Sequence, residues 1–441
     1  MSDKKQALER TVQLAIELAK QQGATSSVVT ASFGSGLTTT VRLGELETVE
    51  HHLDQSLSVT VYKGQSKGIA SGTAFDEASV NELVSAACNI ASFTEEDPFA
   101  GLPDKMELAT EWPELDLYYP WNISVDEAVE LCQRCEALTL KVDKRIKNSD
   151  GANLSTYAGL RTFGNSLGFL NTFASSKHSL DVCVIADENG QMQRDASYSE
   201  ARAAEDLWSP KRIATEAAER TLRRLNPQKI KTGKFPVLFA ADVAQGLFGH
   251  YLGAISGGNL YRHSSFLLDS LGKQVFPKWF TMHEDPYVKR GLASCPYDAE
   301  AVKVSARDLV LDGHVNGYLL STYSARKLGL KSTGNSGGSH NVTVSHTNQS
   351  LDALLKMLGT GLLVTDVIGQ GVNMVTGDYS RGANGLWVEN GEIKHAVEEV
   401  TIAGNLNDMF GNIVAIGNDT ETRGSLQTGS ILIETMMVAS G

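Results

Sequence analysis

The chain has 441 residues, with 52 acidic and 39 basic side chains and a formal net charge of −13. Hydrophobic residues make up 41% of it, which is ordinary for a globular protein and excludes a mainly disordered chain. The acidic balance excludes a broad sequence-independent nucleic-acid surface, because such binding depends on Lys and Arg that neutralise phosphates.

The sequence predicts a cytoplasmic protein that does not enter a membrane. Its start shows no apolar signal segment, and it holds no uncharged apolar run of about 18 residues. Its five cysteines are an odd and sparse set, which suits a reducing compartment better than a disulfide framework.

The N-terminal part alternates helical patterns with glycine-punctuated strand patterns. Apolar residues at steps of three and four predict helices over residues 4–22, 76–92, 125–142 and 206–225. Strand patterns cover residues 26–33, 38–49, 56–62 and 68–72, and more strands are expected between residues 146 and 198.

Cys132 and Cys135 form the only close cysteine pair. A structural zinc site would need two further ligands at matching spacing, which the sequence does not show. In the helical pattern around them, Cys135 shares a face with Leu131 and Leu138, so we interpret the pair as core packing.

The segment from Asn226 to Lys234 predicts a domain boundary, because it combines a helix stop, Pro227, Gly233 and three lysines. We expect a mixed α/β N-terminal domain over residues 1–226 and a β-rich C-terminal domain over residues 234–441, in the α+β class. Short strands are expected in the second domain over residues 313–320, 340–345, 385–389, 392–402, 412–416 and 430–438.

A short apolar strand that starts at Phe235 leads to Asp242 and then to a helical pattern that ends near Ile255. Asp242 is the candidate N-cap, with Gln245 three residues on. Three glycines in this helix, at positions 246, 249 and 253, each cost about 1 kcal/mol relative to Ala. They predict that something packs very close to the helix.

Gly334 to Gly338 match the G-x-S-x-G string that presents a nucleophilic serine on a strand-to-helix turn. Here a strand pattern follows instead of a helix. We interpret the segment as a tight glycine loop that lets another backbone approach closely, with a nucleophilic Ser336 as the alternative.

Several motifs in one order resemble the TldD/PmbA family of bacterial peptidases, and together they resemble its PmbA (TldE) branch. The resemblance covers nearly the whole chain. Its motifs are Gly257–Arg262 with the eleven residues that follow it, Gly291–Ser294, Tyr318–Lys327, Lys331–Asn335 and Gly417–Glu421.

Catalytic members of that family carry H-E-x-x-x-H on the helix after the first strand of the C-terminal domain, and a cysteine near the C-terminus, as zinc ligands. The resemblance puts Gly249 and Ala254 at the histidine positions and His250 at the glutamate position. The last cysteine of the chain is Cys295. We therefore expect no catalytic residue, metal ligand or cofactor in this chain, and zinc in a partner subunit.

The resemblance implies a non-catalytic subunit that pairs with a TldD-type metallopeptidase in a heterodimeric protease that degrades or matures peptides. This chain would line the cleavage chamber, where unfolded peptide would bind as an added strand. Candidate substrate contacts are Tyr261, Arg262, Asn335 and His340, although these loops could instead only support the subunit interface. A sizeable dimer interface is implied, and a homodimer of the isolated chain stays open.

Two other classes of function remain. One is an independently active hydrolase, either a metallopeptidase built from His250, His263, His283 and Glu284 or a serine enzyme at Ser336. The other is a peptide-binding or modulator protein that has no obligate catalytic partner.

Overall fold

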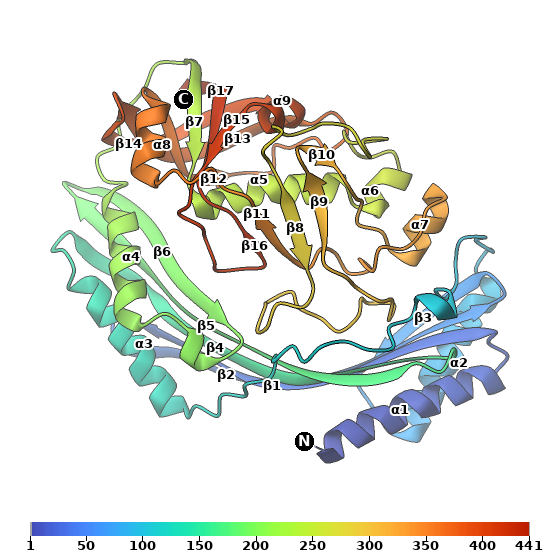
Figure 1. Ribbon diagram of the computed structural model, residues 1–441. Coiled ribbons are helices and arrows are strands. Elements are labelled where there is room, and N and C mark those ends of the chain that lie inside the picture. The colour runs from blue at the N-terminus through green and yellow to red at the C-terminus, as the bar shows by residue number, and fades with distance from the viewer. Residues whose placement is uncertain (1, 441) are drawn as a thin grey trace.

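The computed structural model describes residues 2–440 and has the predicted α+β class, with three β-sheets. The first sheet takes all its strands from residues 26–201, and the other two take theirs from residues 233–440. Figure 1 shows the first sheet as a long curved layer whose inner side faces the C-terminal half of the chain. No helix within residues 2–440 is long and apolar enough to cross a membrane.

The first sheet has six antiparallel strands in the order β3-β2-β1-β4-β5-β6. Its strands are β1 (Ser26–Arg42), β2 (Glu45–Lys63), β3 (Ser66–Gly72), β4 (Ile146–Asn165), β5 (Leu170–Glu188) and β6 (Gln191–Ala201).

Four helices cover the outer side of this sheet in two pairs (Figure 1). They are α1 (Ser2–Gln21), α2 (Glu77–Phe93), α3 (Val125–Leu140) and α4 (Pro210–Leu222), with short 3₁₀ helices η1 (Lys105–Glu107) and η2 (Ala204–Asp206) in the connections. Each pair forms its own apolar core with one end of the sheet. Cys132 and Cys135 lie fully buried in the α3–α4 core, and burial raises the pKa of both thiols to about 12.

The predicted break between the strands at residues 26–33 and 38–49 is wrong, because Gly34 and Gly36 lie inside β1. A Cβ on Gly34 would clash with the ring of Tyr157 on the neighbouring β4, so the glycine serves a close approach and does not end the strand. The chain reverses at Leu43 and Gly44, which have φ values of 51° and 81°.

Helix α4 begins four residues later than predicted. The Oγ of Ser209 accepts the Arg212 backbone N–H, and Pro210 occupies the first helical position. Both features fix a helix start, because the cap satisfies one free N–H and proline has none to satisfy. The residues before Ser209 form η2 and an extended connection instead.

The C-terminal half holds a six-stranded sheet in the order β14-β13-β12-β7-β17-β15 and a five-stranded sheet in the order β10-β9-β8-β11-β16. A further pairing of β14 with β17 closes five strands of the larger sheet into a ring. Its strands are β7 (Gly233–Phe239), β12 (Gly361–Ile368), β13 (Asp378–Glu389), β14 (Glu392–Asn405), β15 (Ile413–Ile416) and β17 (Ile431–Ser440). The smaller sheet has β8 (Met282–Asp285), β9 (Arg307–Leu311), β10 (His314–Val315), β11 (Asn341–Val344) and β16 (Leu426–Gln427).

Five helices complete this half: α5 (Ala241–Ala254), α6 (Gly257–Tyr261), α7 (Thr322–Leu328), α8 (Leu351–Leu358) and α9 (Leu406–Gly411). Of the strand predicted over residues 313–320, only His314–Val315 forms. The backbone N–H groups of Leu319 and Leu320 donate elsewhere, to the carbonyl of Ile255 and the Thr333 hydroxyl.

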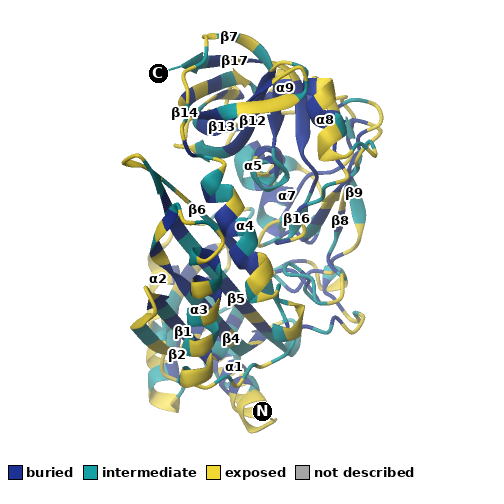
Figure 2. Ribbon diagram, turned by 90° about the vertical axis from the view of Figure 1, so that its left-hand side faces the viewer, coloured by how far each residue is buried: buried dark blue, intermediate teal, exposed yellow. Residues whose placement is uncertain are grey.

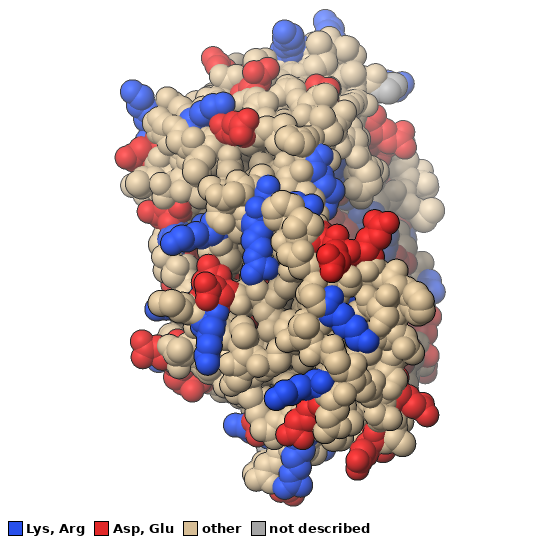
Figure 3. Space-filling model, turned by 90° about the vertical axis from the view of Figure 1, so that its right-hand side faces the viewer, with Lys and Arg blue, Asp and Glu red and all other residues tan. Residues whose placement is uncertain are grey.

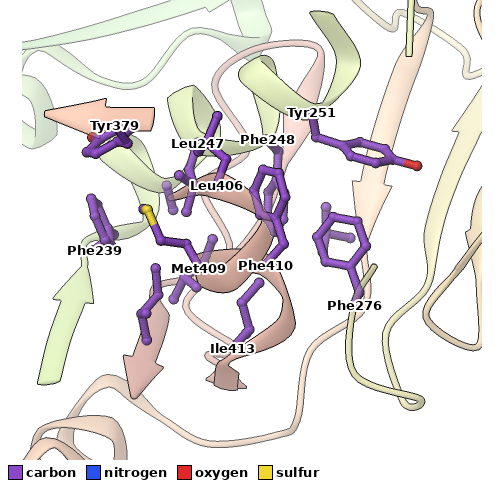
Figure 4. Close-up of a cluster of buried hydrophobic side chains, with 14 of the residues drawn as sticks. Phe239, Leu247, Phe248, Tyr251, Phe276, Tyr379, Leu406, Met409, Phe410 and Ile413 are labelled. Carbon is purple, nitrogen blue, oxygen red and sulfur yellow. The ribbon is translucent and has the colours of Figure 1, made fainter. Parts of the chain in front are cut away.

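The main core of the C-terminal half lies between α5 and the strands around it. Figure 4 shows Leu247, Phe248 and Tyr251 of α5 pointing into a cluster that includes Phe276 and Phe410. Figure 2 shows the contrast between the buried strands of this half and the exposed faces of the outer helices. This packing fixes which face of α5 is left for other contacts.

Candidate functional site

Helix α5 follows β7 directly, as predicted, but its N-cap is Ala240 and not Asp242. The backbone carbonyl of Ala240 accepts the N–H groups of Val243 and Ala244. Asp242 lies one residue into the helix, and its carboxylate oxygen is 2.6 Å from an Arg220 guanidinium nitrogen on α4. The side chain proposed as a cap therefore forms an ion pair between the two halves of the chain.

Contrary to the prediction, no neighbour within residues 2–440 packs closely against the three glycines of α5. Gly246 and Gly249 are exposed, and a Cβ on either would meet no atom within 4 Å. A Cβ on Gly253 would meet only the Met374 methyl carbon, at an ordinary 3.5 Å. The glycines instead leave the helix backbone bare on the face opposite the core.

The positions of the degenerate metal motif point in different directions. Gly249 is on the bare face, whereas Ala254 is fully buried in the core. The His250 ring packs edge-on against Tyr379, with ring centroids 6.1 Å apart, and its Nε2 is buried without a hydrogen-bond partner. Burial and, to a lesser extent, the charge of Arg381 lower the pKa of His250, which favours a neutral ring.

The C-terminal loop that should supply a cysteine carries a different kind of cluster. Gly424 lies beside Gln245 of α5. Next to it, the buried Arg423 guanidinium pairs with both carboxylate oxygens of Glu421 and, at 3.3 Å, with Glu216 of α4. It also lies 4.5 Å from the ring centroid of Trp208. The contacts of Arg423 with Glu216 and Trp208 thus tie this loop to the N-terminal half.

Zinc does not fit the residues that stand at this site. One imidazole, packed on a tyrosine ring, is the only donor on the motif positions, and the C-terminal loop offers no thiolate. Within residues 2–440, no three His, Cys, Asp or Glu side chains are grouped so that they could hold a metal ion. A catalytic zinc needs about three protein ligands and an open position.

Two of the predicted substrate contacts meet on one buried carboxylate. Oε1 of Glu284 accepts Nδ2 of Asn335 and the backbone N–H of His340, both at 2.8 Å. Oε2 of Glu284 accepts Nε of Arg307 at 3.1 Å, and Arg307 also donates to Oδ1 of Asn335 at 2.7 Å. Glu284 is completely buried, so this network fixes the loop between Asn335 and His340.

The other two predicted contacts lie apart from that network, on and after α6. The Tyr261 ring packs edge-on against Tyr323 of α7, and the exposed Arg262 donates to the Tyr261 hydroxyl at 3.1 Å. Gly257 at the start of α6 leaves no room for a Cβ against Ser324, which explains the glycine in this motif. Tyr261 and Arg262 line neither of the two cavities next to the glycine loop.

The glycine loop separates these two cavities. One, of about 490 Å³, lies beside the C-terminal end of α5 and is lined by Gly253 and Asn335. The other, of about 270 Å³, lies against the inner side of the first sheet and is lined by His340. Residues 336–339 line both. Gly337 and Gly338 have φ values of 109° and 113°, so the loop requires glycine there.

The residues of the alternative hydrolases are not brought together. His283 pairs with Asp308 at 2.7 Å, His263 is exposed after α6, and Glu284 is taken up by its buried network. The Ser336 backbone N–H donates to Asp298, and no histidine of the described chain bonds the Ser336 hydroxyl. As expected for a glycine loop, the backbone carbonyl of Lys303 approaches Gly334 too closely for a Cβ.

The surface toward the right of Figure 1 shows no segregation of charge. Figure 3 shows Lys and Arg interspersed with Asp and Glu over this face. Such a mixed surface gives no extended basic track of the kind that binds nucleic-acid phosphates.

Comparison with known protein families gives matches along most of the chain. Residues 29–91 match the PmbA/TldA metallopeptidase domain 1, residues 118–225 the PmbA/TldA metallopeptidase central domain, and residues 232–440 the PmbA/TldA metallopeptidase C-terminal domain.

Individual relatives cover almost the full length. The metalloprotease PmbA of Escherichia coli O157:H7 is 50% identical over 98% of this chain and 96% of its own length. A crystal structure from Bacteroides thetaiotaomicron, described as a putative modulator of DNA gyrase, has a TM-score of 0.93 at 24% identity and covers 98% of both chains. TldE from Thermococcus kodakarensis has a TM-score of 0.85 at 20% identity, over 97% of this chain and 100% of that one. At such identities the two structures show the shared fold alone.

Proposed function

The chain belongs to the PmbA/TldD family of metallopeptidases, and from this premise we propose that it is the non-catalytic subunit of a heterodimeric peptidase. Its partner is a TldD-type subunit that carries the catalytic zinc, and the complex degrades or matures unfolded peptides in the cytoplasm.

The observation that carries the proposal is the loss of the metal ligands in the retained fold. Gly249 and Ala254 stand at the histidine positions, and the C-terminal loop is organised by Arg423 instead of a cysteine. An isolated imidazole such as His250 cannot hold zinc with an open catalytic position. The chain therefore depends on another subunit for metal-assisted hydrolysis.

What this chain contributes is a chamber wall. The bare glycine face of α5 offers backbone without side chains, which suits close contact with an extended peptide or with a partner's backbone. The loop between Asn335 and His340 is held by buried hydrogen bonds and shapes two cavities beside it. Tyr261 and Arg262 remain candidates for peptide contacts, at the side of α6 and α7.

The fold closes the larger C-terminal sheet into a ring, which leaves most of its strands without a free edge. A partner is therefore expected to dock on side chains and loops, and not by extending that ring. When no TldD-type chain is present, two copies of this chain would pair through the surface that otherwise contacts the TldD-type subunit.

Reconstitution tests the proposal. This chain, a TldD-type metallopeptidase and their equimolar mixture are compared for cleavage of an unfolded peptide and for molecular mass by light scattering. We expect cleavage to rise at least tenfold in the mixture, with a heterodimer mass. Chelator-sensitive cleavage by this chain alone, at a rate near that of the mixture, would refute the non-catalytic role. Absence of a mixed complex would refute the partnership.

A further inference from the structure

Cys295 and His340, which are 45 positions apart in the sequence, meet at the end of the smaller cavity. Sγ of Cys295 lies 3.4 Å from Nδ1 of His340. Both residues line the cavity of about 270 Å³ between the loops of the C-terminal half and the inner side of the first sheet. Cys295 is partly accessible, whereas His340 is only 6% exposed.

The hydrogen bonds of His340 define its tautomer. Its Nε2 lies 3.0 Å from the carbonyl oxygen of Gly334, which can only accept, so Nε2 carries the proton. Nδ1 is then the basic nitrogen, and it faces the thiol. The ring is held from the far side by its own loop, whose backbone is fixed in turn by Glu284. A base that is oriented by a third group next to a nucleophile is the arrangement of nucleophilic catalysis.

The cavity in front of the pair is lined by apolar side chains, by one cationic side chain and by the buried carboxyl of Asp298, which already accepts backbone N–H groups. Phe163 and Phe173 from the first sheet and Tyr297 from the loop provide aromatic surface. Arg161 of β4 is exposed and also lines the cavity. A short carbon chain that ends in a carboxylate would match this combination.

We propose that Cys295 and His340 form a nucleophilic pair that accepts an acyl group from an activated carboxylic ester. Sγ of Cys295 bonds to the carbonyl carbon and the ester C–O bond breaks. The thiol proton passes to Nδ1 of His340 and from there to the departing oxygen. The product is a thioester on Cys295, and the activity is separate from peptide cleavage by a zinc-bearing partner.

The surroundings of Cys295 disfavour its thiolate, so the thiol needs His340 to take its proton. Burial, followed by the charges of Asp298 and Glu284, raises the pKa of Cys295 to about 12, although Arg161 opposes this effect. The resting thiol is therefore neutral. Proton transfer to His340 must accompany attack by the thiol. Loss of the imidazole should therefore slow this reaction more than it would slow the reaction of a cysteine that is already ionised.

The reaction can be tested on the full chain with p-nitrophenyl acetate and the p-nitrophenyl half-ester of succinate at pH 8. We expect release of about one equivalent of p-nitrophenol per chain, with the acyl group on the peptide that contains Cys295. His340→Gln, whose amide can still donate to the Gly334 carbonyl, should react about 10²-fold more slowly. Thermal unfolding of each variant verifies that it is folded.

Cys183 is the matched control, because it is also partly exposed but faces the Arg194 guanidinium at 3.1 Å instead of an imidazole. Cys183→Ala should leave the burst unchanged, and Cys295→Ala should remove it. Acylation of Cys183 at the rate of Cys295, or a burst that survives in folded His340→Gln, would overturn the proposal.

A second variant tests the cavity without altering the buried loop that holds His340. Arg161→Gln changes an exposed side chain at the cavity rim. The wild-type chain should prefer the succinyl half-ester over the acetyl ester by about tenfold. The variant should lose this preference, which is measured as the ratio of the two acylation rates so that a change in the reactivity of Cys295 itself cancels. Equal rates for both esters in the wild-type chain would refute the assignment of Arg161, and no thioester with either ester would refute the pair.

Discussion

Oε1 of Glu284 lies 2.8 Å from Nδ2 of Asn335, and both side chains are buried. Asn335→Ala removes a donor from a buried carboxylate and an acceptor from Arg307. We expect the free energy of unfolding to fall by about 2 kcal/mol, because a hydrogen bond to a buried charge is lost without replacement. Urea unfolding measures the change.

The matched control for that change is Asn407→Ala, at an exposed position of α9. It should alter the free energy of unfolding by less than about 0.5 kcal/mol. Equal effects of the two substitutions would mean that the Glu284 network adds nothing to stability.

The sequence predicted the elements but not these contacts. The helical and strand periodicities located α1 and α5 within a few residues, because a buried face repeats at a fixed step. No periodicity links Glu284 to Asn335, or Cys295 to His340, since each pair lies 45 or more positions apart. The antiparallel pairing of β8 with β11 brings Glu284 next to the loop that ends at His340.

The structural reason for a glycine could not be predicted from the sequence either. In α5 the sequence predicted a close neighbour from the energetic cost of glycine, yet Gly246 and Gly249 face open space. In β1 it predicted a break at Gly34, where a neighbouring ring requires glycine inside the strand. Composition marks a glycine as unusual, but only the tertiary structure tells which neighbour, if any, explains it.

Arg423 should be among the most sensitive positions of the chain. It is 5% exposed, pairs with Glu421 and Glu216, and lies over the Trp208 ring. Arg423→Met leaves the buried Glu421 without its partner, so we expect a loss of about 3 kcal/mol or more in the free energy of unfolding. The measurement is chemical denaturation, followed by tryptophan fluorescence.

A double change separates the ion pair from simple packing. Arg423→Met combined with Glu421→Gln removes both charges, and it should recover at least about 1 kcal/mol relative to the single change. If the double variant is less stable than Arg423→Met, the buried charge of Glu421 is not the cause of the loss.

The bare face of α5 permits a stabilising substitution. Gly246→Ala and Gly249→Ala add a methyl group that meets no atom within 4 Å, in a helix interior where Ala is favoured over Gly by about 1 kcal/mol. Each should raise the melting temperature in calorimetry. Gly257→Ala is the contrasting variant, because its methyl group would collide with Ser324, and it should lower the melting temperature. Lower stability of both α5 variants would show that this face is not bare in solution.

Metal analysis addresses the missing ligands directly. After zinc supplementation and gel filtration, elemental mass spectrometry should find less than about 0.1 zinc per chain, because one buried imidazole and no thiolate stand at the motif. A TldD-type metallopeptidase treated in parallel should retain about one. Close to one tightly held zinc in this chain would show that the ligand positions have been misassigned.

Asp298 should make stability depend on pH in a direction opposite to that of an ordinary ion-paired carboxylate. Burial raises its pKa from 3.8 to about 6, although its carboxylate accepts the backbone N–H groups of Ser336, Glu300 and Val302. Folding therefore favours the protonated form. The resulting stabilisation is complete below the pKa of Asp298 in the unfolded chain and is lost as the pH rises through about 6.

The matched variant for the titration of Asp298 is Asp298→Asn, which keeps an acceptor but cannot titrate. From pH 4 to pH 7 the wild-type chain should lose about 2 kcal/mol of unfolding free energy relative to this variant, because the pKa of Asp298 differs between the folded and unfolded chains. A difference between the two proteins that stays constant over this range, measured by urea unfolding at each pH, would show that Asp298 titrates alike in the folded and unfolded chains.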